Sequence, residues 1–179
     1  MKSPVLMIID VQTGLFQGPP APHDAEGVLA RINNLSMRAR AAGVPVLFVQ
    51  HDGSPGEGLE PGSPGWQLHP LLIQEKSDLF IRKIACDSFY RSTLAETLKM
   101  LGANQILATG YATEFCVDTT VRRAASEGFD VIVVSDAHTT KDRPALAAKD
   151  IIAHHNWTLS NLVQPDNPVR VMAEGEIVF

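Results

Sequence analysis

The sequence predicts a single α/β domain, residues 1–179, built as a three-layer doubly wound sheet of about six mostly parallel strands with helices on both faces. Short, almost continuously apolar runs alternate with longer segments in which apolar residues recur every three or four positions. At 179 residues and 45% hydrophobic content, the chain can also bury one core without disulfides or metal. These two observations favour one doubly wound domain.

The apolar runs are short enough to be strands, and their continuous hydrophobicity is typical of parallel strands buried on both faces. The connections between runs and helical segments are mostly a few residues long, as in βαβ units. Strands are therefore expected at 5–10, 45–50, 79–83, 105–111 and 130–137, with a sixth at 169–172.

Four helices are expected between the strands, at 25–42, 92–101, 114–126 and 145–162. Glycines at or just after the ends of the first three are typical helix terminators. The segment 51–77 breaks the pattern, because it is rich in Gly and Pro yet contains Trp66 and Leu68. A loop this long inside a compact domain is usually functional, so we expect it to cover a site.

Charge and cysteine content limit the classes of partner. A formal net charge of −5 leaves no cationic surplus for phosphate groups, so we expect no nucleic acid or membrane partner and a small-molecule substrate instead. The two cysteines, Cys86 and Cys116, are too few for a disulfide framework. The N-terminal apolar run is too short for a signal peptide, and we expect a cytoplasmic location.

Three chemically useful side chains fall at predicted strand ends, where ligands bind in open α/β sheets. Asp10 ends the first strand, Lys83 ends the third, and Cys116 lies in the first turn of the helix after the fourth. A helix N-terminus favours a thiolate, and a buried ammonium needs an anion. Taken singly, a packing cysteine, a turn aspartate and a solvated lysine would explain them as well, but together they predict a nucleophilic site.

Longer motifs make the chain similar to the isochorismatase-like cysteine hydrolases, a family that includes small amidases. The similarity runs along the whole chain and is most specific around the predicted nucleophile. The matching motifs are LMIIDVQ at 6–12, PGSPGW at 61–66, Lys83, TGYATEFCV at 109–117 and Asp136-Ala137.

The resemblance implies a triad of Asp10, Lys83 and Cys116, and an oxyanion hole formed by the N–H groups of Ala112 and Cys116. It also implies a cis peptide bond between Tyr111 and Ala112, hydrolysis of a small-molecule C–N bond through a thioester, no cofactor, and a homo-oligomer. Residues near strand ends or in the long loop are candidates for the substrate pocket: Phe16, Gln50, His51, Trp66, Phe89, Tyr111 and Phe115.

Two other functions remain open at this point. True isochorismatases cleave a vinyl ether and lack the nucleophilic cysteine, and a non-catalytic oligomeric scaffold needs no triad. Nicotinamidases of the family bind a metal through Asp-x-His and further histidines. Here the corresponding residues are Gln50, His51 and Asp52, and the following loop adds only His69, so we expect no metal.

Overall fold

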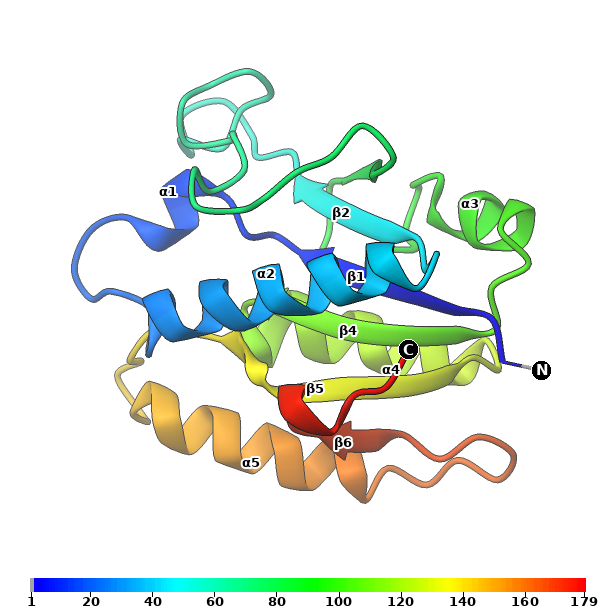
Figure 1. The fold of residues 1–179 in the computed structure, drawn as a ribbon. Helices are drawn as coiled ribbons and strands as arrows, with labels where there is room; N and C mark the ends of the chain where they lie inside the picture. The colour runs from blue at the N-terminus through cyan, green and yellow to red at the C-terminus, as the bar shows by residue number, and fades with distance from the viewer. Residues whose placement is uncertain (1) are drawn as a thin grey trace.

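The computed structural model describes residues 2–179 and contains a six-stranded parallel sheet in the order β3-β2-β1-β4-β5-β6 (Figure 1). This confirms the predicted fold class. Every expected strand is present, with ends that differ from the expected ones by at most two residues. The strands are β1 (Pro4–Ile9), β2 (Val46–His51), β3 (Leu79–Lys83), β4 (Gln105–Tyr111), β5 (Asp130–Thr139) and β6 (Arg170–Met172).

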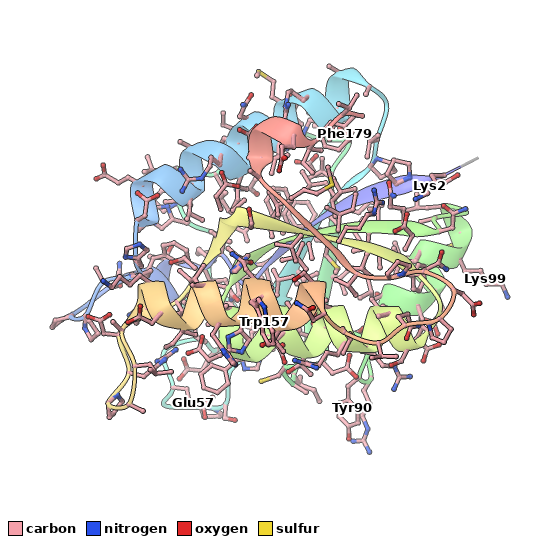
Figure 2. All side chains as sticks on the ribbon, turned by 90° about the horizontal axis from the view of Figure 1, so that it is seen from below. Lys2, Glu57, Tyr90, Lys99, Trp157 and Phe179 are labelled. Atoms are coloured by element: carbon pink, nitrogen blue, oxygen red, sulfur yellow. The ribbon has the colours of Figure 1, made fainter. Side chains whose placement is uncertain are left out.

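Helices cover both faces of the sheet (Figures 1 and 2). One face packs against α2 (Ala25–Ala41) and the C-terminal segment with its short 3₁₀ turn η2 (Glu174–Glu176). The other packs against α3 (Leu94–Met100), α4 (Asp118–Ser126) and α5 (Ala148–Ser160). Because side chains alternate along a strand, β1 supplies Leu6 and Ile8 to the first core and Val5, Met7 and Ile9 to the second.

Three local expectations are corrected. The helix expected at 114–126 begins as a π-helical turn, η1 (Thr113–Val117), which precedes α4. A short helix that the sequence did not predict, α1 (Thr13–Phe16), follows β1. Strand β3 is not buried on both faces, because it lies at the edge of the sheet. Its Phe80 and Arg82 are exposed whereas Ile81 and Lys83 are buried.

The strand order places β1 beside β4, where the direction of winding reverses. Ligands bind outside the carboxyl ends of the strands at such a point. There is no room for a side chain between the two strands there, because a Cβ atom on Gly110 would stand 2.1 Å from the carbonyl oxygen of Ile9. Gly110 also has a φ of +118°, so this position requires glycine.

The long loop is fastened over this end of the sheet. The Gln12 side chain donates hydrogen bonds to the carbonyls of His51 and Trp66 and accepts one from the His51 N–H. Backbone bonds from Thr13 to Gln67 and from Gly14 to Gly65 extend the attachment. The loop is therefore an ordered cover beside the ends of β1 and β2. Within residues 2–179, none of the helices has both the length and the apolarity needed to cross a membrane.

Candidate active site

Asp10, Lys83 and Cys116 meet in one buried cluster at the carboxyl ends of the strands. The Lys83 Nζ atom lies 2.6 Å from Oδ2 of Asp10 and 3.2 Å from Sγ of Cys116. It also donates to the carbonyl of Ala85 at 2.9 Å. Asp10 and Lys83 are each only 1% exposed, so this ammonium obtains its hydrogen bonds from the protein. A carboxylate and a sulfur thus share one buried cation.

The backbone aims Asp10 at the other two side chains. The residue directly follows β1 and has a φ of +50°, which is unusual for a non-glycine residue and turns the chain away from the strand. Its Oδ1 atom is buried without a hydrogen-bond partner of good geometry among residues 2–179. The Cys116 thiol is nevertheless near enough to affect the pKa of the carboxyl.

Burial is the largest single influence on the pKa of each of the three groups. It raises the pKa of Asp10, and the charge of Lys83 offsets this only in part. It also raises the pKa of Cys116, and the negative charge of Asp10 raises it further against the opposing effect of Lys83. Burial alone would lower the pKa of Lys83, but its interactions with Asp10 and Cys116 more than compensate and hold it above the usual value.

The expectation that the helix N-terminus favours a Cys116 thiolate is therefore wrong for the resting site. Burial and the neighbouring carboxylate outweigh the backbone dipole, and the pKa of the thiol is raised. One buried cation supports one buried anion, which at rest is Asp10. A thiol in this state becomes a strong nucleophile only when it loses its proton.

Side chains from the end of β5 and the loop after it hold the turn that carries Cys116. Thr113 Oγ1 lies 2.8 Å from His138 Nδ1. Glu114 Oε1 accepts hydrogen bonds from Thr140 Oγ1 at 2.9 Å and from Arg143 Nε at 2.6 Å. The peptide bond between Tyr111 and Ala112, just before this turn, is cis.

A pocket of about 330 Å³ opens onto this cluster. Its lining combines apolar and aromatic side chains with a few polar ones, among them the carboxyl of Asp10 and the thiol of Cys116. It is lined by Asp10, Leu15, His51, Leu59, Cys86, Tyr111, Ala112, Phe115, Cys116 and Arg143. A few polar groups at the base of an apolar pocket are typical of a small-molecule site.

The model of the isochorismatase domain matches residues 4–158 of this chain. The chain belongs to the isochorismatase family. A solved isochorismatase-family structure superposes with a TM-score of 0.88 at 31% identity, covering 97% of this chain and 99% of the other.

Two curated relatives carry named hydrolase activities. A streptothricin hydrolase from Streptomyces noursei is 37% identical over 140 residues, which is 78% of this chain and 56% of the relative. A ureidoacrylate amidohydrolase from Methylobacterium radiotolerans is 30% identical over 169 residues, covering 74% of this chain and 65% of the relative. The chain spans about half the length of the streptothricin hydrolases it matches.

In this isochorismatase-family chain, the pocket is lined by three of the seven residues expected there: His51, Tyr111 and Phe115. The other four lie elsewhere. Phe16 is in the core and packs on the Tyr111 ring at 5.6 Å. The Gln50 side chain donates a hydrogen bond to the backbone carbonyl of Trp66 at 3.2 Å, and the Trp66 indole N–H donates one to Oδ1 of Asp52. Phe89 packs into the core on the opposite face of the sheet.

Four lining residues were not expected. Leu15 lies on α1, which is too short to show a helical period, and Leu59 belongs to the irregular loop. Cys86 lies three positions after Lys83 and is exposed to the pocket. Arg143 follows β5, so the rule that sites gather at strand ends could have identified it. Its guanidinium lies over the Phe115 ring, 5.3 Å from the centroid.

The side chains do not fit the metal site of the nicotinamidases. His51 reaches the pocket, but His69 packs against Phe16 with the two rings tilted and accepts the Leu71 N–H. Asp52 is engaged with Arg82 at 2.8 Å. Among residues 2–179, no group of three or more His, Cys, Asp or Glu side chains could hold a metal ion. We therefore derive no step through a metal.

Proposed function

We propose that this chain is a cysteine-dependent hydrolase that cleaves a C–N, amide-type bond of a small molecule through a thioester on Cys116. The observation that carries the proposal is the position of Lys83 Nζ, 2.6 Å from Asp10 and 3.2 Å from Cys116. Two relatives, named as a streptothricin hydrolase and a ureidoacrylate amidohydrolase, support hydrolysis of this type.

In the first step, the Cys116 sulfur attacks the carbonyl carbon of the substrate while its proton passes to Asp10. The negative charge moves from the carboxylate to the sulfur and then to the carbonyl oxygen. The first transfer takes place within the buried site and leaves its net charge unchanged, and Lys83 lies beside the negative charge both before and after it. At an effective dielectric constant of about 20, either contact with the ammonium is worth roughly 5–6 kcal/mol before desolvation.

The backbone N–H groups of Ala112 and Cys116 would bind the tetrahedral oxyanion. Asp10 then gives its proton to the departing nitrogen, the C–N bond breaks, and the acyl group remains on sulfur. A water molecule that loses its proton to Asp10 attacks the thioester. The acid is released, and the proton returns to Cys116.

The proposal is tested by intact-mass spectrometry and ammonia release with a panel of primary amides and ureido compounds. Turnover with an acyl adduct that disappears in Cys116→Ala supports it. Undiminished turnover in Cys116→Ala would refute the nucleophile. Cleavage of isochorismate but of no amide would identify an ether hydrolase, and no adduct or turnover with any compound would favour a scaffold.

A further inference from the structure

A chain of buried hydrogen bonds lies behind the nucleophile turn. His138, on β5, is 1% exposed, and its two ring nitrogens contact different elements. Nδ1 lies 2.8 Å from the Thr113 hydroxyl, and Nε2 lies 2.9 Å from Oδ1 of Asn156 on α5. Asn156 in turn donates its amide N–H to the carbonyl of Ser135 at 3.0 Å. The chain links the sheet, α5 and η1.

The direction of each hydrogen bond follows from its chemistry. The Ser135 carbonyl can only accept, so the Asn156 amide must present its NH₂ there and its oxygen to His138. That oxygen also only accepts, so Nε2 of His138 carries the proton. In a neutral ring Nδ1 then carries a lone pair and no proton, so the Thr113 hydroxyl must donate to it. The chain has one consistent arrangement.

The ring is neutral under ordinary conditions. Burial lowers the pKa of His138 to about 4, and the hydrogen bond to Asn156 opposes this only in part. An acceptor is therefore always available to Thr113 near neutral pH.

We propose that His138 is a positioning residue for the nucleophile turn: through its Nδ1 lone pair it fixes Thr113, and with it the Ala112 N–H and the Cys116 sulfur. Thr113 directly follows Ala112 and lies three residues before Cys116. The backbone of His138 also pairs with Gly110 of β4 after a shift in register. One residue thus holds the strand before the turn and the first residue of the turn. This inference rests on the proposed role of Cys116.

Two pairs of variants separate positioning from simple packing. His138→Asn places an amide oxygen near the position of Nδ1 and keeps the acceptor for Thr113, whereas His138→Gln keeps only the donor to Asn156. Thr113→Val removes the hydroxyl at nearly constant volume, and Thr113→Ser restores it. Thr109→Val is the matched control, because its equally buried hydroxyl donates to the Met7 carbonyl within the sheet.

The probe substrate is p-nitrophenyl acetate, with the rate of Cys116→Ala subtracted. Thr113→Val and His138→Gln are expected to lower kcat at least about tenfold with KM within about twofold, because small displacements of reacting groups are costly. Thr113→Ser and His138→Asn should retain most of the activity. Thr109→Val is expected to lose a similar amount of Tm but to keep its kcat. The double variant Thr113→Val/His138→Gln should be no slower than either single variant.

Ring ¹⁵N NMR of the wild-type protein checks the hydrogen bonds without any substrate. A protonated Nε2 and an unprotonated Nδ1 on His138 support the inference, and the reverse tautomer would overturn it. Wild-type kcat in Thr113→Val and His138→Gln, or an equal loss in Thr109→Val, would also overturn it. If the wild type and Cys116→Ala hydrolyse the ester at the same rate, the proposed nucleophile fails, and the positioning role falls with it.

Discussion

Gly110→Ala places a methyl group between the two strands that carry the site. The new Cβ atom would stand 2.1 Å from the carbonyl oxygen of Ile9, whereas C···O contacts are normally no shorter than about 3.3 Å. Strands β1 and β4 would therefore have to separate by about 1 Å. Asp10 directly follows Ile9, and Ala112 lies two residues after Gly110, so the displacement falls on the base and on the proposed oxyanion site together.

A shift of this size is expected to lower kcat about 100-fold. The assay is hydrolysis of p-nitrophenyl acetate, corrected for the Cys116→Ala rate, with urea denaturation of each variant in parallel. Gly43→Ala is the control, because Gly43 also has a positive φ of +73° but a Cβ there would meet nothing within 4 Å. That variant is expected to lose only about 1 kcal/mol of stability. Gly110→Ala with a kcat within threefold of Gly43→Ala would refute the reasoning.

Three further predictions concern charge. Lys83→Met leaves Asp10 as a buried anion without its partner, so the free energy of unfolding, measured in urea, is expected to fall by about 3–5 kcal/mol. Asp10→Asn removes the negative charge that raises the pKa of Cys116. Iodoacetamide should therefore modify Cys116 faster in this variant, while ester turnover is lost. Slower modification would contradict this account of the pKa of Cys116. The pKa of His138 is lowered from 6.5 to about 4 in the fold, so its contribution to stability is complete above pH 6.5 and lost as the pH falls toward 4. Urea melts should show a decrease of up to about 3 kcal/mol over that range, and an equal decrease in His138→Asn would exclude this origin.

The strands, and the strand ends at which Asp10 and Lys83 lie, could be predicted from the sequence because both depend on local pattern. The apolar runs specify the strands, and the rule that sites gather at carboxyl ends selects Asp10 and Lys83. The exposure of Phe80 could not be predicted, since it follows from the edge position of β3 and hence from the pairing of all six strands.

The pocket and its electrostatics depend on contacts between distant segments. Leu59 reaches the pocket only because hydrogen bonds to residues 12–14 fasten its loop over the sheet. The thiol of Cys116 could be placed near a helix N-terminus by spacing, but its raised pKa comes from burial and from Asp10. Neither the depth of burial nor the separation of the two groups is encoded in local sequence.

The attachments of the long loop allow one wall of the pocket to change independently of the residues that are proposed to cleave the bond. The part of the loop around Leu59 is attached through backbone groups of Thr13 and Gly14 and the side chain of Gln12. The hydrogen bond from the loop to Lys83 runs from the Asp52 N–H to the Lys83 carbonyl and lies before that part. Replacement of Leu59 and its neighbours can therefore reshape one wall of the pocket while the reacting groups stay in place. Such a division allows a single scaffold to acquire new substrates by exchange of one segment, and makes residues 54–64 the natural target for altering selectivity in the laboratory.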